Sequence, residues 1–257
     1  MAVLVKQIPD PSGAGRLDPA THRLVRDQGE LVLDPGDAYG IEAALQVAEA
    51  ADGQVVAISM GPPSAAEVIR KAMAMGAAEG MLVTDERLAG ADALQTARVL
   101  ARAVSRVGPD LLLTCTESTD GYTGILPAAL AELLGWPCLT FAKQLQVEGG
   151  KARIQRQTAT GHDLVEADLP AVVSVTGGIN EPRYPTLKGI VGSRSKPLEQ
   201  LSWEALGLEA EVAAQSAVQQ QVVSVQEAPA RTAGEVVDDE GQGAKRIADY
   251  LAELKVI

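Results

Sequence analysis

The segment from Asp110 to Gly124 combines an apolar run with a loop of small and polar residues. Leu111–Cys115 has the length and apolar character of a buried strand, and a helical pattern follows the loop at Ile125. A helix start beyond a buried strand offers free N–H groups and the positive end of a dipole, which suit a phosphate group. Hydroxyl donors and close backbone approach are supplied by Ser118, Thr119, Gly121, Thr123 and Gly124.

The local pattern also fits an ordinary connection between a strand and a helix, because neither a Walker A motif nor a GxGxxG motif is present. Side-chain catalysis has weaker support. His22 and His162 lack a neighbouring nucleophile signature, and the carboxylates of Glu117, Asp120 and Asp163 show no diagnostic spacing. The sequence therefore favours ligand binding, and it predicts no catalytic residue and no metal site.

The composition and charge of the chain argue against some classes of binding partner. The 257 residues include 22 basic and 34 acidic ones, giving a net charge of −12. Phosphate backbones are bound by clustered Lys and Arg, so no nucleic-acid partner is expected. No run approaches the roughly 18 apolar residues of a membrane span, so no membrane insertion is expected. With only two cysteines, Cys115 and Cys138, and no signal peptide, we expect a cytoplasmic protein.

The first half of the chain alternates buried strands with amphipathic helices, which predicts an α/β fold. Specifically, we expect a Rossmann-like parallel sheet with helices on both faces. Asp34-Pro35-Gly36-Asp37 predicts a helix entry, Asp92 is a candidate helix cap, and Ser64 with Glu67 forms a candidate capping box. The expected strands are Val3–Val5, Gln54–Ser59, Met81–Val83 and Leu111–Cys115. Between the first strand and the first helix, Arg23–Arg26 and Glu30–Leu33 predict a small hairpin outside the main sheet.

The second half adds an antiparallel region. Leu139–Val147 and Ala152–Gln157 flank the turn Glu148-Gly149-Gly150, Leu164–Ala167 predicts a further strand, and Ala171–Thr176 predicts a return to the main sheet. Residues 180–195 are basic and lack periodicity. They are either a solvated connector or an exposed partner-binding loop with Leu187 at its tip.

The C-terminal part differs in kind from the rest. It contains a short predicted strand at Val222–Val225 and a final helix from Ala244 with a narrow stripe of Ile247, Leu251 and Leu254. Such a helix must dock on another surface. We therefore predict a nucleotide-binding α/β domain over residues 1–200, which includes loop 180–195, and an extended C-terminal arm and helix over residues 201–257.

Several motifs in order resemble the β subunit of electron transfer flavoproteins, and the resemblance covers nearly the whole chain. The most specific are Leu169–Val175 and the block Asn180-Glu181-Pro182-Arg183-Tyr184-Pro185-Thr186-Leu187. Further matches are Val5–Asp10, Ser59–Pro62, Ala72–Ala77, Leu134–Pro137 and Arg231–Gly234.

The resemblance implies a heterodimer with an α subunit that holds most of the redox-active FAD, on which the C-terminal arm docks. It also implies a structural AMP in this chain. Electrons would pass from acyl-CoA and related dehydrogenases, as in fatty acid oxidation, toward a quinone oxidoreductase. Arg183, Tyr184 and Leu187 are the implied partner-recognition residues. The implied cofactor contacts are Leu4, Asp34, Pro35, Gly36, Asp37, Met60, Cys115, Thr119, Asp120, Gly121, Tyr122, Thr123, Gly124, Ile125 and Leu126.

Departures from the usual family pattern leave two alternatives open. Asp34-Pro35-Gly36 and Glu117–Gly124 differ from the usual residues at those positions. The same pocket could therefore hold a second FAD, as in relatives that bifurcate electrons. A stand-alone adenine-nucleotide enzyme on a similar fold is the third hypothesis, although the first strand carries no phosphate-activating motif.

Overall fold

The computed structural model describes residues 1–13, 15–27, 29–208, 222–226, 228–229, 236, 239 and 241–256. The chain divides into two units, Met1–Val223 and Ser224–Ile257. The predicted domain boundary at residue 200 falls inside a strand of the first unit, Leu198–Leu201, and the buried side chains of Trp203 and Leu208 also belong to that unit.

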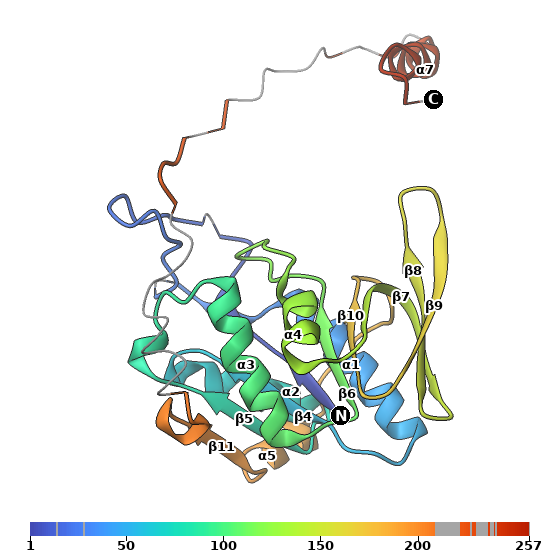
Figure 1. The fold of residues 1–257 in the computed structure, drawn as a ribbon. Coiled ribbons are helices and arrows are strands. Elements are labelled where there is room, and N and C mark those ends of the chain that lie inside the picture. The colour runs from blue at the N-terminus through green and yellow to red at the C-terminus, as the bar shows by residue number, and fades with distance from the viewer. Residues whose placement is uncertain are drawn as a thin grey trace. The chain divides into compact units, whose positions relative to one another are not determined.

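The first unit is built on a nine-stranded sheet (Figure 1). Its spatial order is β11-β5-β4-β1-β6-β10-β7-β8-β9, in which all neighbours from β11 to β7 are parallel and the last two pairs are antiparallel. This arrangement confirms the predicted α/β class, the added antiparallel region and the return of β10 to the main sheet. The strands are β1 (Ala2–Leu4), β4 (Val56–Met60), β5 (Glu79–Val83), β6 (Leu111–Cys115), β7 (Cys138–Glu148), β8 (Lys151–Gln157), β9 (His162–Asp168), β10 (Ala171–Val175) and β11 (Leu198–Leu201).

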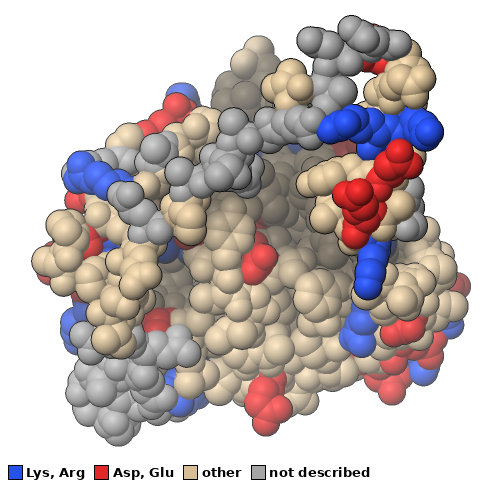
Figure 2. Space-filling model, turned by 90° about the horizontal axis from the view of Figure 1, so that it is seen from above, with Lys and Arg blue, Asp and Glu red and all other residues tan. Residues whose placement is uncertain are grey.

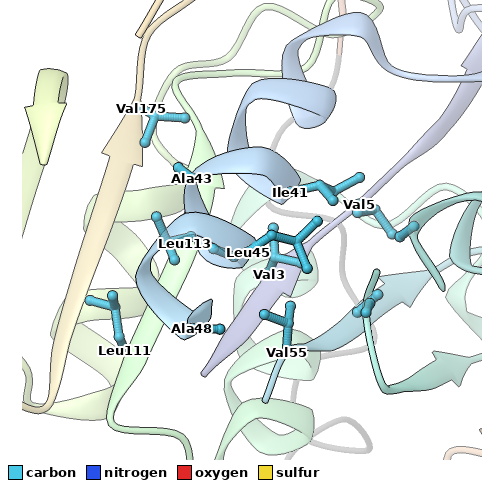
Figure 3. Packing of buried hydrophobic residues seen from close by; sticks show 14 of the residues in the cluster. Val3, Val5, Ile41, Ala43, Leu45, Ala48, Val55, Leu111, Leu113 and Val175 are labelled. Carbon is cyan, nitrogen blue, oxygen red and sulfur yellow. The ribbon is translucent and has the colours of Figure 1, made fainter. Parts of the chain in front are cut away.

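Helices cover both faces of the sheet, because successive residues of a buried strand point to opposite faces. Leu111 and Leu113 of β6 pack in one apolar cluster, whereas Leu112 belongs to the other. In Figure 3, residues of the first helix such as Ile41 and Leu45 lie over the first of these clusters. That cluster includes residues of α1 (Pro35–Ala50) and α2 (Ala66–Met75), and the second includes residues of α3 (Ala93–Val107) and α4 (Leu126–Leu134).

The sheet changes its winding direction between β1 and β6. The helix after β1 contributes to one apolar cluster and the helix after β6 to the other, so the two connections diverge. Ligands of open α/β sheets bind beyond the carboxyl ends of strands at such a point. α1 lies against β6 at two glycines: a Cβ atom at Gly36 would lie 3.4 Å from Cys115 Cβ, and one at Gly40 would lie 3.6 Å from the Thr114 carbonyl carbon.

The hairpin predicted around Asp27 is wrong. β3 (Leu31–Leu33) pairs antiparallel with β2 (Gln7–Pro9) in a separate two-stranded sheet, while Leu24 makes an isolated bridge with Leu17. The observed pairing places Ile8 opposite the β3 strand and buries it completely, which the local alternative would not achieve. The expectation that this segment leaves the main sheet is confirmed.

The capping box at Ser64 is also wrong. The chain forms a 3₁₀ turn, η1 (Pro63–Ala65), before α2, and α2 has no side-chain cap. The Ser64 hydroxyl instead donates to Gln7 Oε1 at 2.8 Å, so a tertiary contact replaces the local one. Asp92 caps α3 as predicted, and α1 begins at the predicted helix entry, where Asp34 is its cap.

Residues 180–195 are not wholly irregular, because they contain the short helix α5 (Leu187–Ser193). The Thr186 hydroxyl caps it by accepting a hydrogen bond from Gly189 N at 3.0 Å. The sequence did not predict α5, because seven residues are too few to show a helical period. The edge strand β11 was not predicted either. Further 3₁₀ turns are η2 (Glu86–Leu88) and η3 (Glu204–Leu206).

The second unit contains α7 (Gly243–Glu253), which confirms the predicted final helix. The expected strand at Val222–Val225 is absent from these described residues, which form no regular structure. The matched motif Arg231–Gly234 lies outside the described residues. None of the helices that the structure describes is both long and apolar enough to cross a membrane.

Candidate functional site

Asp34 lies beyond the ends of β1 and β6, where open α/β sheets have their ligand crevice. Its fully buried carboxylate accepts hydrogen bonds from Gly36 N at 2.9 Å, from Thr119 N at 2.7 Å and from Thr119 Oγ1 at 3.2 Å. The first of these bonds caps α1, and the other two hold the loop that follows β6. One carboxylate therefore fixes the two segments that border the crevice.

A second buried carboxylate, Asp37, lies one helical turn further into α1. Burial raises its pKa to about 7, and the nearby Asp34 carboxylate adds to the shift. The backbone N–H of Lys6 donates to Asp37 Oδ2 at 2.7 Å. Burial and the same two carboxylates also raise the pKa of the Cys115 thiol, which donates to the Glu117 carbonyl oxygen at 3.0 Å. Cys115 is thus held as a neutral thiol and is unsuited to act as a nucleophile.

Asp120 forms ion pairs with two cationic side chains beside this site. Its side chain is only 4% exposed and accepts from Lys6 Nζ and from Arg26 Nε, each at 2.6 Å. Burial opposes ionisation of Asp120, but the hydrogen bonds from Lys6 and Arg26 outweigh that effect and lower its pKa. Lys6 Nζ also donates to Ser118 Oγ at 3.2 Å. Two cations therefore share the one carboxylate of Asp120.

The loop from Gly121 to Ile125 is exposed and turns sharply. The N–H groups of Gly121 and Tyr122 both donate to the Ser118 carbonyl oxygen, and Tyr122 and Gly124 have positive φ angles of 48° and 64°. α4 then begins without a side-chain cap. Backbone donors at the start of α4 are therefore left for water or a ligand.

Most of the cofactor contacts implied by the resemblance lie in or beside this crevice. The structure brings Asp34, Gly36, Asp37, Cys115, Thr119 and Asp120 together, with the 121–126 loop bordering them. Leu4 and Met60 end the neighbouring strands β1 and β4, Leu4 being buried and Met60 partly so, while Pro35 occupies the first turn of α1 and is exposed.

Two basic residues of the crevice were missed. Lys6 lies two residues beyond the end of β1, so its position near the strand end was a usable signal. Arg26 comes from the excursion before β3 and reaches Asp120 across 94 residues, for which the sequence offers no local signal. In Figure 2, seen from above, Lys and Arg side chains are interspersed with Asp and Glu, and no large patch of one sign is visible on this face.

The residues implied in partner recognition lie elsewhere on the first unit. Tyr184 is 93% exposed and Leu187, the first residue of α5, is 79% exposed. Arg183 differs from them, because its guanidinium group is hydrogen-bonded to Glu42 and Glu49 of α1. Among the described residues, no cluster of three or more His, Cys, Asp or Glu could hold a metal ion.

The family model for the electron transfer flavoprotein domain matches residues 21–206. Over 263 residues the chain is also 40% identical to the electron transfer flavoprotein subunit beta of Mycobacterium tuberculosis (strain ATCC 25618 / H37Rv), covering 100% of this chain and 99% of that protein. The chain belongs to the electron transfer flavoprotein β-subunit family. An electron-transfer role follows from this membership.

Other relatives support the same assignment. The electron transfer flavoprotein subunit beta of Mycobacterium leprae (strain TN) is 41% identical over 264 residues, which span 100% of this chain and 99% of the relative. A subunit of the caffeyl-CoA reductase-Etf complex of Acetobacterium woodii, named CarD, is 32% identical over 237 residues, 91% of this chain and 90% of the relative.

Proposed function

We propose that this chain pairs with an electron transfer flavoprotein α subunit, binds AMP in the crevice beyond β1 and β6, and helps to hold the FAD of the α subunit. Acyl-CoA and related dehydrogenases deliver electrons, which continue toward a quinone oxidoreductase of the respiratory chain. The observation that carries the proposal is this crevice, in a chain that matches electron transfer flavoprotein β subunits over its full length.

The residues present fit an adenine mononucleotide. The cationic side chains of Lys6 and Arg26 and the uncapped start of α4 suit a phosphate group. Leu4 and Met60 offer apolar contact to a base from the adjacent strand ends. The buried carboxylate of Asp34 holds the bordering loop in position. This chain's residues thus bind and orient the nucleotide and take no part in bond making.

The proposed redox chemistry is supplied by the flavin, which accepts and passes on electrons when bound. This chain's own task is to hold the nucleotide and to present a docking surface. Both cysteines are free thiols, which agrees with the expected cytoplasmic location.

The proposed docking surface comprises Tyr184, Leu187, Ile190 and Val191, all exposed apolar or aromatic side chains. Leu187, Ile190 and Val191 stand at helical spacing on α5, so their side chains share one side of this helix. Exposed contiguous apolar groups mark interaction sites, and a leucine that fills a pocket on a dehydrogenase suits this role.

A second candidate function places a second FAD in the crevice in place of AMP. The similarity to a subunit of a caffeyl-CoA reductase-Etf complex favours keeping this candidate. Membership in a family of electron-transfer subunits favours an AMP-binding subunit or a subunit with a second FAD over a stand-alone nucleotide enzyme.

Reconstitution tests the proposed function. The chain is co-expressed with the α subunit encoded in the same organism, and the complex is mixed with an acyl-CoA dehydrogenase and its substrate. We expect a yellow heterodimer whose flavin absorbance is bleached on mixing, whereas the isolated chain carries no flavin. Failure of the two subunits to copurify, or a flavin that stays oxidised, would contradict the proposal.

A further inference from the structure

The segment from Gly177 to Lys196, which carries the proposed docking surface, is fastened to two helices. Near its start, Asn180 Nδ2 donates to the Tyr39 carbonyl oxygen of α1 at 3.1 Å. Near its end, Arg70 Nη1 of α2 donates to the carbonyl oxygens of Ser193 and Lys196 at 2.5 and 2.7 Å. Both ends of the segment are therefore anchored, and the exposed side chains lie between them.

Arg183 is the strongest of these anchors. Its Nε and Nη2 atoms donate to the two carboxylate oxygens of Glu42 at 2.7 and 3.0 Å, and Nη1 and Nη2 donate to Glu49 at 2.5 and 3.2 Å. The Arg183 backbone N–H adds a bond to Glu42 at 3.2 Å. Paired N–H donors that match a carboxylate fix orientation as well as distance.

The two acceptors differ in their surroundings. Glu42 is almost fully buried and also accepts from Gln46 Nε2 at 2.9 Å, whereas the Glu49 side chain is largely exposed. Burial opposes ionisation of Glu42, but its hydrogen bonds, led by those from Arg183, outweigh this and lower its pKa. Removing Arg183 would leave a buried carboxylate without its cation, which is costly.

The guanidinium group of Arg183 is thus already engaged by its own chain. Tyr184 follows it directly, and Pro185 and the Thr186 cap lead within three residues to Leu187. The fixed φ of proline and the helix cap leave this connection little freedom. A displacement of Arg183 would therefore move the exposed Tyr184 and Leu187.

We propose that Arg183 is a positioning residue for partner docking: its bonds to Glu42 and Glu49 hold Tyr184 and Leu187 in the docking-competent arrangement, and Arg183 does not itself contact the dehydrogenase. This inference rests on the proposed docking function of α5. It also changes the role implied by the sequence resemblance, in which Arg183 was grouped with the contact residues.

A double-mutant cycle separates positioning from direct contact. The variants Arg183→Gln, Leu187→Ala, Tyr184→Ala with Leu187→Ala, and the combination of all three changes are made in the α–β heterodimer, and kcat and KM are measured with an acyl-CoA dehydrogenase as electron donor. If only about a tenth of the Arg183→Gln molecules retain the competent arrangement, the KM for the heterodimer rises about tenfold. kcat and flavin content are expected to stay unchanged.

The combination decides the mechanism. If Arg183 acts only through Tyr184 and Leu187, Arg183→Gln adds less than about twofold to KM when both of these residues are already alanine, because coupled residues are not additive. Multiplication of the Arg183→Gln effect by the effect of the two alanine changes would show that Arg183 contacts the partner directly and would overturn the proposal. An unchanged KM for Arg183→Gln in the presence of a raised KM for Leu187→Ala would overturn it as well.

Variants of the two acceptors, Glu42 and Glu49, test the same hydrogen bonds by changing the carboxylates in place of Arg183. Glu42→Gln is expected to raise KM more than Glu49→Gln, because Glu42 is buried and receives three of the five bonds. Arg183→Lys keeps the charge but loses the paired donors, so its KM should lie between those of the wild type and Arg183→Gln. Equal KM values for Glu42→Gln and the wild type would overturn the proposal.

A matched control uses a different surface ion pair. Arg106 Nη2 lies 2.7 Å from Glu199 Oε1, and both side chains are exposed, so Arg106→Gln removes a comparable charge from α3 and should leave KM unchanged. The experiment also separates this inference from the proposed function. An unaltered KM for Leu187→Ala would contradict the proposed docking surface itself. A raised KM for Leu187→Ala together with an unaltered KM for the Arg183 variants would contradict only the positioning role.

Discussion

Replacement of Leu187 by alanine is expected to raise the KM for a partner dehydrogenase about 10- to 100-fold. The side chain is 79% exposed in this chain, so nearly all of its surface is available for burial in a complex. Complete burial of a leucine contributes about 1.5–3 kcal/mol, which corresponds to the expected factor. Steady-state transfer from an acyl-CoA dehydrogenase to the heterodimer measures the change.

The flavin and AMP content of the Leu187→Ala heterodimer should equal those of the wild type, because Leu187 lies on α5 and not among the residues of the crevice. Leu164→Ala is the matched control: this leucine of β9 is 74% exposed but lies outside α5, and its replacement should leave KM unchanged. Equal KM values for Leu187→Ala and the wild type would show that α5 is not the docking surface.

The stability of the protein should fall as pH rises from about 4 to about 7 through the contribution of Asp37. Its folded pKa of about 7 lies above the ordinary value of 3.8, so in this interval the native state holds a proton that the unfolded state has released. The contribution reaches up to about 4 kcal/mol, because each unit of pKa difference corresponds to about 1.4 kcal/mol.

The variant Asp37→Asn separates the contribution of Asp37 to folding stability from that of other carboxylates, whose contributions change with pH in the opposite direction. The asparagine stays neutral, and its side-chain oxygen can still accept the hydrogen bond from Lys6 N. The variant should gain stability relative to the wild type as pH rises from 4 to 7. Thermal unfolding of both heterodimers over this range measures the difference, with the exposed Asp163→Asn as control. A stability difference that does not change with pH would show that Asp37 is ionised in the folded protein.

The sequence predicted the elements whose signals are local. Leu111–Cys115 was placed with its observed bounds, and the start of α1 was recognised at Asp34-Pro35-Gly36-Asp37. Asp92 was recognised as a cap because a capping side chain acts within three residues of itself. The turn Glu148-Gly149-Gly150 likewise predicted the β7–β8 hairpin. Such features depend on neighbours in the chain and not on the completed fold.

Features determined by tertiary contacts were missed or mistaken. Leu31–Leu33 pairs with Gln7–Pro9 because this pairing buries Ile8, and Ser64 donates to Gln7 instead of capping a helix. In the crevice, the pairing of Arg26 with Asp120 joins residues that are distant in the sequence. The hydrogen bonds between Arg183 and α1 also join residues that are distant in the sequence, so they could not be predicted.

The nucleotide content of the purified heterodimer tests the central claim most directly. The complex is denatured, and the released nucleotides are separated and identified by mass. The account predicts about one AMP for each FAD, and it predicts that Lys6→Ala combined with Arg26→Ala lowers the AMP content without lowering the FAD content. Two FAD molecules per heterodimer with no AMP, or a heterodimer that releases FAD alone, would contradict it.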